Sequence, residues 1–303
     1  LAVVTLNRRQ NRMDIYMANP RSTECTLAVR EENEKYIPET TYGSLRFFGD
    51  RFAFISDRSG FKHIYLYNLS GKLERQLTKG DFDVAAFYDY DPATGRCFYA
   101  AHDESPLRTS ICISEKNGKV RRLTSTPGTH SAIFSKDKKY FLDTYSSLQQ
   151  PPVVSLCRTS DGRSEKVLVD NAKLKEKTDA LFSPKEFFTC PGSQEVRDAW
   201  SIGLYPGAAF ESYLADQGFI VACVDGRGTG ARGAAFEKCT YLKLGEIESA
   251  DQVAVAKWLA AQTYVDGERI GIWGWSFGGF NTLMSMSEGT PVFRAGVAVA
   301  APS

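Results

Sequence analysis

Residues 269–279 read RIGIWGWSFGG, and this stretch decides the fold of the C-terminal part of the chain. Its first half is an apolar run typical of a buried strand. The run continues directly into Gly274-Trp275-Ser276-Phe277-Gly278, which fits the pattern G-x-S-x-G, and then into a segment with helical spacing. A strand, a tight turn and a helix in this order predict a nucleophile elbow, in which only small residues fit beside the serine.

Ser276 is therefore the candidate nucleophile. In an elbow its Oγ would project above the sheet near a helix N-terminus, and the backbone N–H of Phe277 would point at a developing oxyanion. Gly274 and Gly278 meet the need for small neighbours, and Gly279 extends it. The alternative is a serine in an ordinary turn between a strand and a helix.

The sequence around the elbow predicts an α/β domain. Apolar runs predict parallel strands, and a three-to-four-residue apolar period predicts helices between them. Strand, helix, strand, helix, strand in succession indicates a parallel sheet. The expected strands are Phe219–Val224, Arg269–Gly274 and Ala295–Ala300, and the expected helices are Ile247–Gln262 and Phe277–Met286.

A glycine-rich loop, Asp225–Gly233, follows the first expected strand. It loosely fits the dinucleotide fingerprint G-x-G-x-x-G/A. However, the acids about 20 residues further on, Glu246 and Glu248, begin a helix and do not end a strand. We therefore expect no nucleotide and no other cofactor.

The first 182 residues have a different pattern, a weak internal repeat of strands and turns. The turn glycines Gly71, Gly118 and Gly162 are spaced by 47 and then 44 residues. Such a period is typical of a four-stranded propeller blade. About four units of this size fit into residues 1–182. We therefore expect a mixed fold, with a partial β-propeller of about four blades in residues 1–182 and an α/β domain in residues 183–303.

Composition excludes several classes of protein. The chain has 303 residues, 43% of them hydrophobic and 24% charged, with a net charge of +1. This is an ordinary globular balance without the basic excess of a nucleic-acid or membrane-surface protein. The seven cysteines form no C-x-x-C pair, and we expect mostly buried free thiols, with one or more disulfides as the alternative. The three histidines lack metal-ligand spacing, so we expect no metal site. We expect the adjacent Glu31 and Glu32 to lie in a solvated turn.

Three segments together carry a resemblance to a known family: VACVDGRGTG at 221–230, the elbow at 269–279, and MSMSEGTPVF at 284–293. They resemble the prolyl oligopeptidase family of serine peptidases, and within it the dipeptidyl peptidases. The resemblance implies a β-propeller joined to an α/β-hydrolase domain, of which this chain would hold an incomplete part. It implies an exported protein, periplasmic or at the cell surface, and a homodimer in the full-length form.

The resemblance also implies a reaction. Peptides with a penultimate proline or alanine would lose an N-terminal dipeptide, through an acyl-enzyme on Ser276. The main-chain N–H of Phe277 would help bind the oxyanion. The Phe277 ring would lie beside the proline pocket, where the family usually has tyrosine.

Several family features are missing from the sequence. Only 27 residues follow Ser276, with no histidine, no aspartate and Glu288 as the sole acid. The triad order Ser, Asp or Glu, His is therefore not completed. Near Thr189–Pro191 the strand that carries a second oxyanion donor in the family is absent. The paired glutamates that bind the substrate amine belong upstream of Leu1, where we expect the natural N-terminus to be missing.

We therefore expect a truncated or internally deleted member of the family that is inactive as this chain. Two alternatives remain open. The first is a non-catalytic propeller module for binding or dimerisation. The second is a different α/β-hydrolase such as an esterase, which the repeat disfavours.

Overall fold

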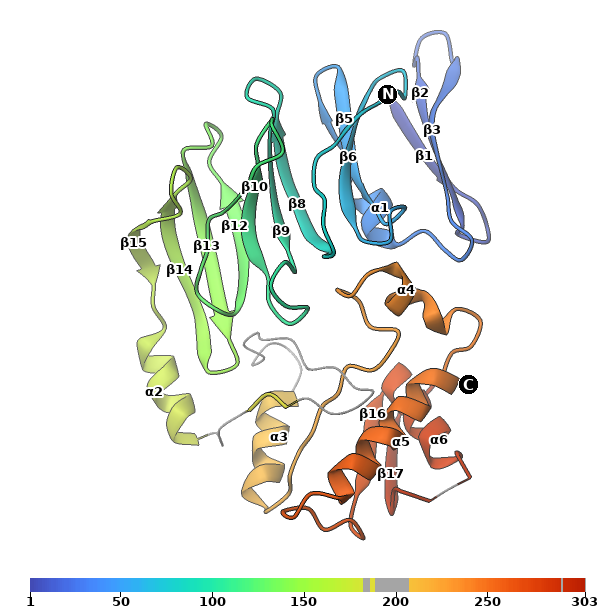
Figure 1. The fold of residues 1–303 in the computed structure, drawn as a ribbon, viewed down its shortest axis with the longest axis vertical. Helices are drawn as coiled ribbons and strands as arrows, with labels where there is room; N and C mark the ends of the chain where they lie inside the picture. The colour runs from blue at the N-terminus through green and yellow to red at the C-terminus, as the bar shows by residue number, and fades with distance from the viewer. Residues whose placement is uncertain (182–185, 189–206, 290, 303) are drawn as a thin grey trace. The chain divides into compact units, whose positions relative to one another are not determined.

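The computed structural model describes residues 1–181, 186–188, 207–289 and 291–302 of the chain. These residues form two compact units (Figure 1). Unit 1 comprises Leu1–Ala172 together with Ala231–Ala234, and unit 2 comprises Lys173–Gly230 and Ala235–Ser303. The expected boundary between residues 182 and 183 lies outside the described residues, so it stays a prediction.

Unit 1 consists of four antiparallel sheets in chain order, without a closed barrel (Figure 1). Within each sheet, strands adjacent in sequence are paired, as in a meander. Helix α1 (Glu39–Gly43) connects the first two sheets. Sheet 1 contains β1 (Ala2–Leu6), β2 (Arg12–Ala18) and β3 (Cys25–Glu32). Sheet 2 contains β4 (Arg46–Phe48), β5 (Arg51–Ser56), β6 (His63–Asn68) and β7 (Leu73–Gln76). Sheet 3 contains β8 (Val84–Asp91), β9 (Arg96–Ala101), β10 (Ser110–Ser114) and β11 (Val120–Arg122). Sheet 4 contains β12 (Thr129–Phe134), β13 (Tyr140–Ser147), β14 (Gln150–Arg158) and β15 (Ser164–Val169).

The central strands of sheets 2 and 3 are apolar on both faces because each sheet packs between two others. In β5, Phe52 and Phe54 face a cluster shared with sheet 1, whereas Ala53 and Ile55 face a cluster shared with sheet 3. In β9, Phe98 likewise packs toward sheet 4, and its neighbour Tyr99 packs toward sheet 2. Successive side chains of a strand point to opposite faces, so an unbroken apolar run fills two cores at once.

The structure shows the internal repeat as equivalent contacts. In sheet 2 the amide of Ile64 donates a hydrogen bond to Thr78 Oγ1, and in sheet 3 the amide of Ile111 donates to Thr124 Oγ1, both at 3.0 Å. Strand register gives the same correspondence at a second position. Arg75 pairs with Leu66, Arg121 with Ile113 and Lys166 with Leu156. Sheets 2, 3 and 4 are therefore built on one plan.

Unit 2 contains a short parallel sheet with helices. Strands β16 (Gly271–Trp275) and β17 (Ala295–Val299) pair in parallel, with Ile272 opposite Gly296. The helices are α2 (Ala172–Leu181), α3 (Gly207–Asp216), α4 (Ala234–Glu237), a 3-10 turn η1 (Lys238–Thr240), α5 (Glu246–Ala260) and α6 (Phe277–Met286). Both expected helices and the two later strands are confirmed, and the bounds of α6 are those that the sequence predicted.

The expected strand Phe219–Val224 is wrong. These residues have no assigned secondary structure, and the side chains of Phe219 and Ile220 are 61% and 59% exposed. Among the described residues, no strand pairs with this run. An apolar run alone does not supply the neighbouring strand that would accept its backbone hydrogen bonds.

Cys25, Cys97, Cys112, Cys157, Cys223 and Cys239 are free thiols, as expected, although Cys25 and Cys223 are exposed. Cys190 lies outside the described residues. None of the helices in the described part of the chain is long and apolar enough to cross a membrane.

Candidate active site

Ser276 occupies a strained backbone position between β16 and α6. Its φ is 54° and its ψ is −119°, a conformation that residues with a side chain rarely adopt. Two hydrogen bonds hold the turn. The Ser276 amide donates to Val299 O in β17 at 2.8 Å, and the Phe280 amide in α6 donates to Ser276 O at 3.1 Å. The backbone of Ser276 is thus fixed by β16, β17 and α6. Its side chain is exposed.

The glycines around Ser276 have different roles. A Cβ at Gly274 would lie 2.3 Å from the backbone carbonyl of Gly278, and a Cβ at Gly279 would lie 2.9 Å from Val299 O. Neither position can hold a side chain without moving backbone. A Cβ at Gly278, in contrast, would meet nothing within 4 Å. The expected requirement for small residues therefore holds at positions 274 and 279. At position 278, the backbone carbonyl itself lies close to Gly274.

Phe277 is the first residue of α6, as expected from the sequence. The N–H groups of the first helical turn lack carbonyl partners within the helix, and the helix dipole places partial positive charge there. This is an environment that favours negative charge next to Ser276. The Phe277 ring is 43% exposed, and it contacts the Phe280 ring at a centroid distance of 5.7 Å.

The three histidines all lie in unit 1, where they have structural partners. His63 Nε2 lies 2.9 Å from Gly80 O, and its Nδ1 lies 3.1 Å from Thr78 Oγ1. Burial lowers the pKa of His63, while the Gly80 carbonyl partly opposes that change. His102 Nδ1 lies 2.8 Å from Arg108 O.

His130 also has oxygen partners within its own unit. Nδ1 lies 2.9 Å from both carboxylate oxygens of Asp143, and Nε2 lies 2.9 Å from Thr126 O. Both ring nitrogens of His130 therefore lie within hydrogen-bond distance of oxygen atoms of unit 1.

Two acids in the described part of unit 2, Glu288 and Asp251, bind other side chains. Glu288 lies beyond the far end of α6, about 15 Å along the helix from Ser276, and it accepts a hydrogen bond from Ser249 Oγ at 2.7 Å. Asp251, 4% exposed, binds the guanidinium of Arg227 at 2.6 Å and accepts the Arg227 amide at 2.8 Å. This contact anchors the glycine-rich loop to α5. The hydrogen bond to Asp251 also raises the pKa of the Arg227 guanidinium.

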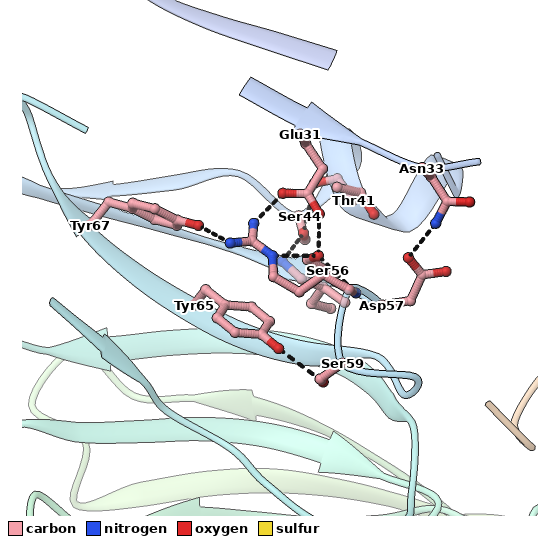
Figure 2. A network of polar contacts seen from close by, with 11 residues as sticks. Glu31, Asn33, Thr41, Ser44, Ser56, Asp57, Ser59, Tyr65 and Tyr67 are labelled. Atoms are coloured by element: carbon pink, nitrogen blue, oxygen red, sulfur yellow. Dashed lines mark hydrogen bonds and ion pairs between the residues drawn. The ribbon is translucent and has the colours of Figure 1, made fainter. Parts of the chain in front are cut away.

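The expectation for Glu31 is wrong: it is not in a solvated turn. Glu31 is the penultimate residue of β3 and is 6% exposed. It accepts a hydrogen bond from Ser56 (Figure 2) and another from Arg58. Arg58 also donates to the Tyr67 hydroxyl, and its guanidinium lies 4.5 Å from the centre of the Tyr65 ring. Burial raises the pKa of Glu31, and Arg58 opposes that rise. Glu32 is exposed, as expected.

This network, which links sheet 1 to sheet 2, was missed by sequence reasoning. The signal was the period of two in β3, which places Glu31 on the same face as buried Val29. Among the residues that the structure describes, no group of three His, Cys, Asp or Glu side chains is arranged to hold a metal ion. The expected gap near Thr189–Pro191 lies outside the described residues.

Comparison with known proteins agrees with these features. The family described as the dipeptidyl peptidase IV N-terminal region matches residues 1–152, and the prolyl oligopeptidase family matches residues 209–303. Curated relatives include a probable dipeptidyl peptidase 4 of Aspergillus flavus, 27% identical, and dipeptidyl peptidase 4 of Trichophyton equinum, 28% identical. Each alignment covers 99% of this chain and 44% of the relative.

Among solved structures, dipeptidyl peptidase 4 of Porphyromonas gingivalis is similar with a TM-score of 0.91 and 38% identity. That match covers 99% of this chain and 47% of the solved chain. The chain thus spans less than half the length of these relatives. Its antiparallel sheets match their N-terminal region, and the segment with Ser276 matches their peptidase region. The chain belongs to the dipeptidyl peptidase IV group of the prolyl oligopeptidase family.

Proposed function

We propose that Ser276 is the nucleophile of a serine-type dipeptidyl peptidase, which releases N-terminal dipeptides from peptides with a penultimate proline or alanine. The observation that carries this proposal is the backbone of Ser276, an exposed serine with φ 54° between β16 and α6. Such strain persists only where the surrounding structure over-determines it, and it is concentrated at functional sites. A serine in an ordinary turn would not need this conformation.

The chemistry follows from the position of the side chain. Ser276 Oγ attacks the carbonyl carbon of the second residue, the peptide nitrogen leaves with a proton, and water hydrolyses the resulting ester. The Phe277 N–H binds the oxyanion of the tetrahedral intermediate. The sheets of unit 1 are part of a β-propeller, and unit 2 is part of an α/β-hydrolase domain.

We further propose that this chain alone does not turn over. A serine hydroxyl needs a base within about 3 Å. The histidines are engaged within unit 1, and the acids Asp251 and Glu288 bind Arg227 and Ser249. Dimerisation and export stay predictions, since they rest on the resemblance.

Two measurements with glycyl-prolyl-p-nitroanilide test the proposal. The chain alone should release no more p-nitroaniline than its Ser276→Ala variant. A chimera, in which this chain replaces the aligned segment of the Porphyromonas gingivalis enzyme, should hydrolyse the substrate. Ser276→Ala should reduce that activity by about 10⁶-fold, the scale for loss of a serine nucleophile.

Turnover in a folded chimera that survives Ser276→Ala would contradict the assignment of the nucleophile. Turnover by the chain alone that depends on Ser276 would show that it contains a base after all. Cleavage of p-nitrophenyl esters without cleavage of prolyl dipeptides would favour an esterase.

A further inference from the structure

Phe280 lies one helical turn after Phe277 on the same side of α6. Residues three apart on a helix are neighbours, and here their rings contact each other at a centroid distance of 5.7 Å and an interplanar angle of 34°. The Phe277 ring is 43% exposed, so few contacts define its orientation. The ring of Phe280, which is half-buried, is one of these contacts.

Phe280 also packs against the start of α5. Gly245 is the N-cap of that helix, with φ +88°. A Cβ at Gly245 would lie 2.7 Å from Phe280 Cε1 and 2.9 Å from Met284 Cγ. The ring therefore fills the space that a side chain at position 245 would need.

The backbone at Gly245 is itself fixed. Its amide donates a hydrogen bond to Glu248 Oε2 at 2.9 Å, and its carbonyl accepts one from the Ser249 amide at 3.2 Å. Phe280 thus contacts both a fixed helix end and the Phe277 ring.

We propose that Phe280 is a positioning residue, which holds the Phe277 ring beside Ser276 and so adjusts the pocket for the penultimate residue of the substrate. This inference rests on the proposed function. A rigid ring gives an apolar wall for the flat pyrrolidine of proline, and a mobile ring would fit alanine about as well. The loss of Phe280 should therefore reduce preference for proline without removing the nucleophile.

The first test uses the full chain and does not depend on catalysis. Phe277 is replaced by 4-fluorophenylalanine, and its ¹⁹F NMR resonance is compared with and without Phe280→Ala. We expect Phe280→Ala to shift the resonance toward that of the free amino acid and to narrow it, because the ring gains motion. Phe210→Ala is the matched control, since Phe210 contacts Trp273 and has its own ring pair at 5.4 Å.

An unchanged resonance in Phe280→Ala, or an equal change in Phe210→Ala, would overturn the positioning role. Phe280→Leu should give an intermediate resonance, because it keeps apolar bulk against Phe277. If Phe280→Ala does not fold, the Leu variant still decides the question.

The second test uses the chimera with the Porphyromonas gingivalis enzyme. The ratio of kcat/KM for glycyl-prolyl and glycyl-alanyl p-nitroanilides should fall about 10-fold in Phe280→Ala, the scale of one lost apolar contact in a pocket. Phe280→Leu should restore part of the ratio. Normal turnover with an unchanged ratio would overturn this inference alone. A folded chimera without any turnover would instead contradict the proposed function, and the ¹⁹F experiment would still judge whether Phe280 holds the ring.

Discussion

Strands β9 and β16 have similarly apolar sequences, but they are covered very differently. In β9, Phe98 is 1% exposed and Tyr99 is fully buried, because sheets 2 and 4 pack on the two faces of sheet 3. In β16, Trp273 and Trp275 are 46% and 66% exposed on one face. On the other face, Ile272 packs against the cluster formed with α5. Parallel sheets normally have both faces covered. Unit 1 therefore contains its own cores. In the described part of unit 2, one face of the strand that carries Ser276 stays largely exposed, with the Phe210 ring of α3 in contact with Trp273.

Truncation of an apolar side chain to alanine should give the largest difference in stability loss between the two units. Phe98→Ala should destabilise unit 1 by about 3–5 kcal/mol, because it removes a fully packed ring. Val297→Ala in β17 should cost under about 1 kcal/mol, because the Val297 side chain is 58% exposed. Hydrogen-exchange mass spectrometry measures each unit from its own peptides. Equal losses of protection in the two variants would show that the exposed face of β16 and β17 is covered in solution.

Removal of an ion pair should also cost more stability in unit 1 than in unit 2. Arg58→Met should destabilise unit 1 by about 3 kcal/mol at pH 7, because it leaves the buried carboxylate of Glu31 without its cation. Arg269→Met in unit 2 should cost under about 0.5 kcal/mol, since Arg269 and its partner Asp266 are 81% and 49% exposed. Urea titration followed by hydrogen exchange of each unit measures both values.

The stability lost in Arg58→Met should depend on pH, and the pKa of Glu31 sets the direction. Burial already raises the pKa of Glu31 in the folded chain, and loss of Arg58 raises it further. A carboxyl with a raised folded pKa is more protonated in the folded state, so its penalty shrinks as the pH falls. Arg58→Met should therefore recover stability relative to the wild type between pH 7 and pH 5. The double variant Glu31→Gln/Arg58→Met should recover most of it at pH 7. A deficit that does not change with pH would mean that Arg58 acts through its ring contacts and not through its charge.

The sequence predicted local features better than pairings. The bounds of α6, the elbow at Ser276 and the repeat of sheets 2 to 4 followed from helical spacing, a short motif and regular turn glycines. Each of these depends on residues that are close in the sequence. The motif even predicted where a strained backbone would lie, because glycines at fixed offsets indicate a close approach of backbone.

Long-range partners were not predictable in the same way. The apolar run Phe219–Val224 has the composition of a buried strand, but composition does not show whether a neighbouring strand is available to pair with it. The partner of Glu31 is Arg58, 27 residues away in the turn that follows β5 of the next sheet. Alternation along β3 could have indicated burial of Glu31, but only the packing of sheets 1 and 2 identifies the cation.

Alanine substitution at the two motif glycines tests how tightly the elbow is built. Gly274→Ala should destabilise unit 2 by about 2 kcal/mol, because its Cβ would overlap the Gly278 carbonyl at 2.3 Å. Gly278→Ala should be neutral or slightly stabilising, since its Cβ meets nothing within 4 Å and alanine favours a helix over glycine. Far-UV circular dichroism during urea titration, with hydrogen exchange of the β16 peptide, measures both. Equal destabilisation by the two variants would contradict the described backbone of this turn.

The smallest expected effect tests whether sheets 2, 3 and 4 are equivalent units. Arg75 donates hydrogen bonds to Lys116 O and Gly95 O in the turns of sheet 3, both at 2.7 Å. Arg121 does the same in the turn of sheet 4, to Thr159 O at 2.8 Å and Ser160 O at 2.7 Å. Lys166 has the equivalent position in sheet 4, and its side chain is exposed.

Arg75→Ala and Arg121→Ala should therefore each destabilise unit 1 by about 1 kcal/mol, the net value of a charged donor shared between two partly exposed carbonyls. Lys166→Ala should leave its stability unchanged within about 0.3 kcal/mol, as for a surface substitution. Chemical denaturation of the three variants side by side gives the comparison. A loss in Lys166→Ala as large as in the arginine variants would mean that the outer face of sheet 4 has a partner in solution. Unequal losses in the two arginine variants would show that the repeat is one of sequence and register only, without an equivalent contact between successive sheets.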